Sequence, residues 1–227
     1  MQISVLTSNG YVKILPGFAY LFNKFYPDQK VTVVRYDVRP PKLPDNFNNY
    51  AIGNQADYTW SGGLRVYLDT LEDKHILLML EDYYLDKPVD VEKIHNIHGM
   101  MLEDERIVKV DLTDDRLKVD YTDYHTNDFI VSDLNTPFLA SVQAAIWRVD
   151  FLKAILNKND NAWQFEKNKR TKTYLNKNKA VILGSHKPPM SYINAVGGEG
   201  NKPGEYDLKK IPQWMIEELK ANNVWGT

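Results

Sequence analysis

The segment His75-Ile-Leu-Leu-Met-Leu-Glu-Asp-Tyr-Tyr84 points most directly to the architecture of this chain. Its five consecutive apolar residues, Ile76–Leu80, are typical of a strand buried on both faces inside a helix-covered parallel sheet. Ligands of such sheets bind at the carboxyl ends of the strands, which is where Glu81 and Asp82 follow. Two carboxylates can hold a hard divalent cation, which in turn can neutralise a diphosphate. The alternative is that the strand ends in solvated acids, as many strands do.

The segments on either side alternate between strand and helix patterns. Apolar residues at helical spacing predict a helix from about Ile14 to Phe25, and Asp90 is well placed as the N-cap of a later one. This alternation predicts an α/β fold, with a Rossmann-like, mostly parallel central sheet flanked by helices. The expected strands are 3–7, 31–36, 47–52, 75–80, 107–111 and 180–184, and the expected helices are 14–25, 61–71, 91–102, 148–156, 163–175 and 212–221.

The composition excludes several classes of protein. The chain has 227 residues, a formal net charge of -2 and no cysteine. Disulfides and thiolate metal sites are therefore excluded, and the net charge gives no general attraction to nucleic acid or anionic membranes. No apolar run approaches the roughly 20 residues of a membrane span, and the N-terminus lacks the basic start of a signal peptide. We expect a cytoplasmic protein with one domain over residues 1–227.

Four blocks of sequence, taken in order, resemble a family of small bacterial and phage glycosyltransferases of the GT-A fold. The likeness runs from the first predicted strand to the loop near Val196. It implies a nucleotide-sugar-binding half over about residues 1–105 and an acceptor-binding half over about 106–227. The blocks are Ile3-Ser-Val-Leu-Thr-Ser8 with Leu15-Pro-Gly-Phe-Ala-Tyr-Leu-Phe22, then Leu80-Glu-Asp-Tyr-Tyr-Leu85, then Ser141-Val-Gln-Ala-Ala-Ile-Trp147 with Phe151-Leu152, and finally Asn161-Ala-Trp-Gln-Phe-Glu166.

The resemblance assigns the end of the first strand to the donor nucleotide. Thr7 and Ser8 occupy the place where such enzymes contact the base and the ribose. The family pattern also leads us to expect an aspartate at the position of Asn9 or Gly10, and this chain has none. An ordinary surface turn is the alternative.

A second donor contact is predicted around the helix that opens at Ser61. A helix N-terminus with Gly62-Gly63 allows the close approach of an anion, and Arg65 can pair with a phosphate. Trp60 is expected to stack on the nucleotide. Alternatively, Trp60 anchors the helix and Arg65 only lies along its surface.

The acidic pair resembles the metal motif of the fold, although the usual Asp-x-Asp form is absent. Asp82 is the first choice as metal ligand, Glu81 contacts the donor or the metal, and Tyr83 lines the sugar pocket, although strand alternation would place Tyr83 or its neighbour in the core. His186 follows the last strand, where the fold sometimes carries a further metal ligand. A lone histidine is more often structural.

The resemblance places the catalytic base at Glu166, where inverting GT-A enzymes often carry theirs. Such a carboxylate removes the proton of the acceptor hydroxyl as the sugar carbon is attacked. The alternative is an ordinary i, i+4 helix pair of Glu166 with Arg170. Trp147 and Trp163 would be acceptor-binding platforms for a sugar ring, or else core anchors.

Together these assignments predict a hexosyl- or pentosyltransferase dependent on Mn²⁺ or Mg²⁺, located in the cytoplasm of a bacterium or a phage-infected host cell. The acceptor is a glycan, or a hydroxylated base of phage DNA bound by a basic patch that could equally be a solvated helix face. A nucleotide- or glycan-binding protein without turnover is the rival interpretation. The patch comprises Lys167, Lys169, Arg170, Lys172, Lys177 and Lys179.

Overall fold

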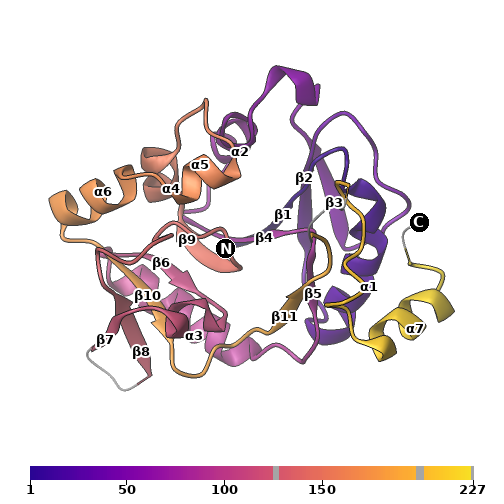
Figure 1. The fold of residues 1–227 in the computed structure, drawn as a ribbon. Coiled ribbons are helices and arrows are strands. Elements are labelled where there is room, and N and C mark those ends of the chain that lie inside the picture. The colour runs from indigo at the N-terminus through magenta and orange to yellow at the C-terminus, as the bar shows by residue number, and fades with distance from the viewer. Residues whose placement is uncertain (125–127, 198–201, 226–227) are drawn as a thin grey trace. The chain divides into compact units, whose positions relative to one another are not determined.

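The computed structural model describes residues 1–124, 128–197 and 202–225, and within it the chain forms two compact units. Unit 1 comprises Met1–Gln2, Ala56–Met79 and Asp90–Pro189, and unit 2 comprises Ile3–Gln55, Leu80–Val89 and Met190–Thr227. Unit 2 thus combines segments from near both ends of the sequence, indigo and yellow in Figure 1, whereas unit 1 is formed mostly by the middle of the chain. No helix in the described ranges is long and apolar enough to cross a membrane.

Unit 2 is built on three parallel strands. Strand β1 (Gln2–Leu6) pairs in parallel with β2 (Val31–Arg35), which pairs in parallel with β3 (Phe47–Ala51). Helix α1 (Leu15–Phe25) carries a proline in its first turn and buries its apolar face, including Phe18 and Phe22, which pack on Phe47. A short antiparallel pair, β5 (Tyr83–Leu85) with β11 (Tyr192–Asn194), and helix α7 (Gln213–Ala221) complete the unit.

Unit 1 contains six strands in the order β4-β9-β6-β10-β8-β7. Strand β9 is antiparallel to both of its neighbours, β10 is parallel to β6, and β8 is antiparallel to both β10 and β7. Four strands therefore share one direction while β9 and β8 oppose it. The strands are β4 (His75–Leu80), β6 (Ile107–Asp111), β7 (Tyr121–Tyr124), β8 (Phe129–Ser132), β9 (Ala145–Arg148) and β10 (Val181–Ser185).

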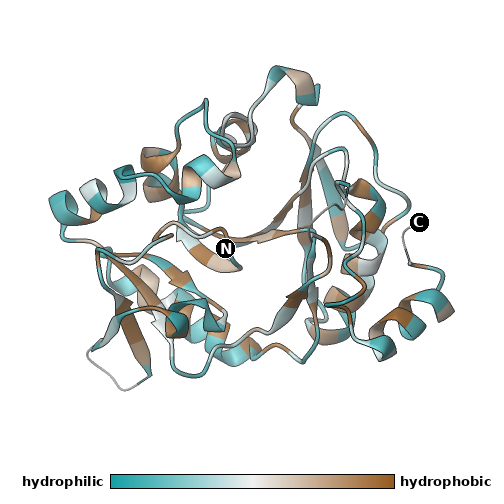
Figure 2. Ribbon diagram, viewed as in Figure 1, coloured by the Kyte–Doolittle hydropathy of each residue, from teal (hydrophilic) through white to brown (hydrophobic). Residues whose placement is uncertain are grey.

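Five helices belong to the same unit. Helices α2, α4, α5 and α6 lie together, with α4 contacting both α2 and α6 (Figure 1). Apolar residues gather on the strands, whereas α6 is largely hydrophilic (Figure 2). The helices are α2 (Trp60–Leu68), α3 (Val91–Glu103), α4 (Val149–Ile155), α5 (Ala162–Glu166) and α6 (Arg170–Asn178).

The strand that the sequence marked most clearly is confirmed: Ile76–Met79 in β4 are completely or almost completely buried. The mostly parallel sheet and the flanking helices follow the prediction. Several helix boundaries differ from it, and α2 ends at Leu68 instead of near residue 71. The helix predicted from Arg148 begins only at Val149, because 145–148 pair as β9, and the helix predicted over 163–175 is interrupted after Glu166.

The interruption has a local cause. Asn161 and Gln164 form a capping box that starts α5, and the Asn168 side chain then accepts a hydrogen bond from the Thr171 backbone amide. The asparagine thereby starts a new helix at α6 instead of extending the old one.

Candidate functional site

The acidic pair follows β4 and meets the end of β1 in unit 2. Glu81 is buried, and it accepts hydrogen bonds from the Thr7 hydroxyl and the Ser8 backbone. Burial and the neighbouring charge of Asp82 nevertheless raise the pKa of Glu81 well above its usual value. Burial also raises the pKa of Asp82 to about 6, although the positive charge of Lys210 opposes this. The positive charge near Glu81 and Asp82 is thus too small to offset the cost of ionising both carboxyl groups.

The donor set of this pair suits a hard cation. Carboxylate oxygens are the ligands that Mg²⁺ and Mn²⁺ prefer, and a bound dication would offset the cost of ionising Glu81 and Asp82. Over the described residues, no group of three or more histidine, cysteine, aspartate or glutamate side chains is arranged to hold a metal ion. Glu81 and Asp82 would therefore hold a cation without a third such side chain from the described residues.

A carboxylate that sequence reasoning missed lies beside the Thr7–Asn9 loop. The Asn9 side-chain amide donates to Asp37 Oδ1 at 2.8 Å, and the Gln55 backbone amide donates to the same oxygen at 3.0 Å. These bonds lower the pKa of Asp37, so the carboxylate is ionised at neutral pH. The signal was available, because Asp37 follows the predicted strand 31–36, the parallel neighbour of the first strand. An acid therefore lies next to Asn9, although neither position 9 nor position 10 carries one.

Tyr83 does not line an open pocket, and this prediction is wrong. Its side chain is 3% exposed and stacks on Tyr192, with ring centroids 4.2 Å apart. The neighbouring Tyr84 is also buried, and its hydroxyl donates to the Ile14 carbonyl at 2.7 Å. Both tyrosines belong to the packing of unit 2, because β5 pairs with β11.

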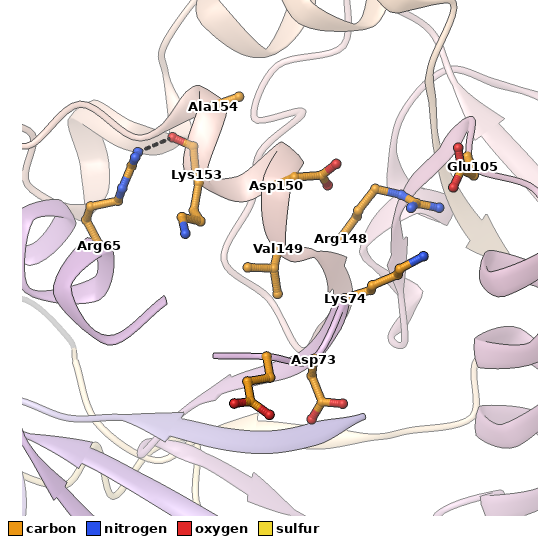
Figure 3. A pocket seen from close by; sticks show the side chains of 10 residues that line it. Arg65, Asp73, Lys74, Glu105, Arg148, Val149, Asp150, Lys153 and Ala154 are labelled. Atoms are coloured by element: carbon orange, nitrogen blue, oxygen red, sulfur yellow. Dashed lines mark hydrogen bonds between the residues drawn. The ribbon is translucent and has the colours of Figure 1, made fainter. Parts of the chain in front are cut away.

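The predicted donor contacts of α2 have partners within unit 1. The Trp60 ring packs on Phe165 at 5.3 Å between centroids. Arg65 Nη1 donates to the Lys153 carbonyl at 2.8 Å, drawn as a dashed line in Figure 3, and Nε lies 3.3 Å from Asp69 Oδ2. These contacts support the packing alternative for both residues, and contact with a nucleotide stays a prediction.

Arg65 also lines a cavity of about 620 Å³ that lies wholly in unit 1 (Figure 3). The cavity combines basic side chains such as Lys74 and Arg148 with acidic ones such as Glu105 and Asp150. Its charges are balanced, so it has no clear preference for an anion or a cation.

Glu166 ends α5 beside a different cavity, of about 310 Å³. Its Oε1 accepts a hydrogen bond from the Val142 backbone amide at 2.8 Å. Burial raises the pKa of Glu166 although this hydrogen bond opposes the shift. The alternative role, an ion pair with Arg170, is wrong: Arg170 pairs with Asp160 and donates to the Ile155 carbonyl.

A buried ionic network lies within electrostatic reach of Glu166. Lys109 Nζ is 2.6 Å from Asp111 Oδ1, and Arg116 Nε is 3.1 Å from Asp111 Oδ2, with all three side chains almost fully buried. The positive charges of Lys109 and Arg116 act to lower the pKa of Glu166. Gly184 makes room for the network, since a Cβ there would lie 2.5 Å from Arg116 Cβ.

The two tryptophans predicted as acceptor platforms differ in their exposure to solvent. Trp147 is completely buried between Phe151 and Phe165, so it offers no ring face to a sugar and the prediction for it is wrong. Trp163 is 66% exposed on α5, three residues before Glu166, and its position is compatible with a platform.

His186 has a different partner from the one predicted. Its Nε2 lies 2.9 Å from Asp123 Oδ1, and its ring packs against Tyr121 of β7. These contacts give it a role within unit 1, and metal ligation by His186 stays a prediction.

Comparison with known proteins supports the fold and goes no further. No family of known proteins matches the chain, and no curated protein does. Among solved structures, S. aureus TarS 1-349 matches with a TM-score of 0.51 at 16% identity over 84% of this chain. TarS 1-349 in complex with UDP-GlcNAc matches with a TM-score of 0.50 at 16% identity over 97%. UDP-glucose pyrophosphorylase complexed with UDP-glucose matches with a TM-score of 0.51 at 9% identity over 86% of this chain and 93% of its own.

The predicted α/β, Rossmann-like GT-A fold is confirmed. The chain spans 60% of the first TarS structure and 65% of the second. At these identities the likeness concerns the fold alone.

Proposed function

We propose that this chain is a metal-dependent glycosyltransferase that moves a sugar from a nucleoside diphosphate sugar to an acceptor hydroxyl. The observation that carries the proposal is the carboxylate pair Glu81-Asp82 beside the end of β1, in which Glu81 is buried and Asp82 is partly exposed. Its support from outside the chain is a fold shared with proteins crystallised with UDP-GlcNAc and UDP-glucose.

The donor is bound by unit 2 in this proposal. Asp82 and Glu81 hold a Mn²⁺ or Mg²⁺ ion, which when bound supplies positive charge to the diphosphate leaving group. Ser8 and Asp37 stand at the carboxyl ends of adjacent parallel strands, the edge at which α/β folds bind ligands. Asp37 can accept a hydrogen bond from a base N–H, since its pKa is lowered and it stays ionised.

The acceptor is activated by Glu166. The carboxylate takes the proton of the acceptor hydroxyl, the hydroxyl oxygen bonds to the anomeric carbon of the sugar, and the bond from that carbon to the diphosphate breaks. The raised pKa of Glu166 makes it a stronger base than an ordinary glutamate. Direct attack from the opposite side inverts the configuration. The acceptor is a glycan hydroxyl, and a hydroxylated base of phage DNA is the alternative that an acceptor screen would detect.

The test separates donor binding from transfer. UDP and UDP-sugars are titrated in Mn²⁺ against the wild type and Asp82→Asn, which should lose the metal-dependent part of the affinity. Glu166→Gln should keep donor binding but lose roughly 100- to 10,000-fold in transfer rate. Glu103→Gln, at an exposed end of α3, is the matched control.

Two results would contradict the proposal. Unchanged Mn²⁺-dependent affinity in Asp82→Asn removes the acidic pair from the donor site. Transfer by Glu166→Gln at the wild-type rate removes the base. Donor binding with no transfer or hydrolysis in the wild type would favour the nucleotide-binding alternative.

A further inference from the structure

The cavity beside Glu166 is basic. It lies wholly in unit 1, between the segment 134–139 and the end of α5 with the start of α6. Lys167, Lys169 and Lys172 line it, and Glu166 is the acid among its lining residues. We call it the lysine cavity. Three ammonium groups around one carboxylate give this site a positive potential at neutral pH.

The charge is local to this segment. The chain as a whole has a formal net charge of -2. In residues 161–180, by contrast, Glu166 is the one acid and all other charged residues are basic. Helix α6 is correspondingly hydrophilic in Figure 2. Arg170 is paired with Asp160, whereas the Lys172 ammonium donates to Asn135 Oδ1 at 2.5 Å, a neutral partner that does not cancel its charge. The basic residues of the segment are Lys167, Lys169, Arg170, Lys172, Lys177 and Lys179.

Two exposed aromatic rings lie close to Lys167 of the lysine cavity. Trp163 is 66% exposed and Phe138 is 39% exposed, and the Lys167 ammonium lies 5.4 Å and 5.9 Å from their ring centroids. Phe138 has φ of 57°, a left-handed conformation that is costly for a bulky residue. Its carbonyl accepts hydrogen bonds from the Ser141 amide and from Arg116 Nη2, which hold it there.

We infer that the lysine cavity binds an acceptor glycan bearing an anionic substituent, a phosphate or a carboxylate. The inference rests on the proposed function, because it treats Glu166 as the base. The sugar ring stacks on Trp163 and Phe138, and the anionic group pairs with Lys169 and Lys172 through charge-assisted hydrogen bonds. The net charge of -2 favours a glycan over a nucleic acid, because the protein as a whole has no excess of positive charge to attract a long run of phosphates.

The test measures glycan binding without any transfer. Four probes are titrated by tryptophan fluorescence: a neutral malto-oligosaccharide, its 6-phosphorylated form, an oligogalacturonide of the same length, and oligo(dT). We expect both anionic glycans to bind at least about tenfold more tightly than the neutral one, with the difference shrinking as salt screens the charges. The phosphorylated and carboxylated arms distinguish the two sources of charge.

Matched charge-removal variants locate the contact. Lys169→Gln/Lys172→Gln should reduce the affinity for anionic glycans to that for the neutral one. Lys30→Gln/Lys158→Gln removes the same charge from exposed lysines that neither line the cavity nor belong to the basic segment, and should bind as the wild type does.

Several outcomes would overturn the inference. These are equal binding of neutral and anionic glycans, no binding of the anionic glycans, an equal loss in the control variant, and tighter binding of oligo(dT) than of either anionic glycan. A parallel UDP-sugar titration in Mn²⁺ reports on the proposed function separately, because it depends on Asp82 in unit 2 and not on the lysines.

Discussion

Asp82→Asn is expected to make the metal-free protein more stable above neutral pH, although it removes a proposed metal ligand. Burial raises the pKa of Asp82 from its ordinary value of 3.8 to about 6. Because the folded pKa exceeds the unfolded one, the folded protein binds more protons over this interval, and the free energy of unfolding falls as the pH rises through it. At about 1.36 kcal/mol per pH unit, ionised Asp82 costs the folded state about 3 kcal/mol above this interval. Asparagine cannot ionise and should recover most of that free energy.

The assay is urea unfolding of the metal-free wild type and variant at about pH 3 and about pH 8. The two proteins should be equally stable at the lower pH, where Asp82 is protonated in both states, and should differ by up to about 3 kcal/mol at the higher one. Asp45→Asn is the control, since substituting an exposed aspartate usually changes stability by less than about 0.5 kcal/mol.

Added Mn²⁺ should reverse the order of stability, because the wild type alone gains the free energy of metal binding at Asp82. The reasoning would be refuted by a variant that is less stable than the wild type at high pH without metal. That result would mean that contacts in unit 2 already compensate the ionised carboxylate.

Three further predictions concern the residues that surround the two carboxylate sites. Thr7→Val removes a hydroxyl that donates to Glu81, so the pKa of Glu81 should rise further and Mn²⁺ binding should require a higher pH. Binding is followed as the Mn²⁺-induced thermal shift at several pH values, and an unchanged pH dependence would show that Thr7 does not act on the acidic pair. Asp111→Asn leaves Lys109 and Arg116 buried without their shared partner and should lower the free energy of unfolding, measured in urea, by about 3–5 kcal/mol. A loss below about 1 kcal/mol would contradict this prediction. Gly184→Ala places a Cβ 2.5 Å from Arg116 Cβ and should cost about 1–3 kcal/mol, and a neutral effect would show that Arg116 can move aside.

The fold was predictable where the hydrophobic pattern has one interpretation. The uninterrupted run Ile76–Leu80 is too short for a helix and too apolar for an exposed strand, so it had to be a buried strand. The pattern over 163–175 was ambiguous, since both α5 and α6 continue one helical spacing. The capping by Asn161 and Asn168 that divides them depends on side-chain hydrogen bonds that spacing does not reveal.

The site was predictable only in part, for a related reason. Strand ends mark where ligands bind, and this rule singled out Glu81 and Asp82. The resemblance singled out Thr7, whose side chain the structure brings to Glu81. Aromatic residues carry no such marker. Trp147 and Trp163 looked alike in the sequence, yet one is completely buried and the other is 66% exposed, because Trp147 belongs to the inner strand β9 and Trp163 to the short helix α5.

The residue that depends most on long-range contacts is Glu166. Its backbone partner Val142 is 24 residues away in the sequence, and the cations that act on its pKa, Lys109 and Arg116, come from two further segments. The local sequence places Glu166 only at the end of a five-residue helix, and a helix of this length is too short to be stable alone. A base must be held within hydrogen-bond reach of its acceptor proton. The Val142 amide holds the Glu166 carboxylate, and the buried network acts on its charge, so transfer would depend on both. Substitutions at Lys109 or Asp111 should therefore alter the pH dependence of transfer even though neither side chain is exposed to a substrate.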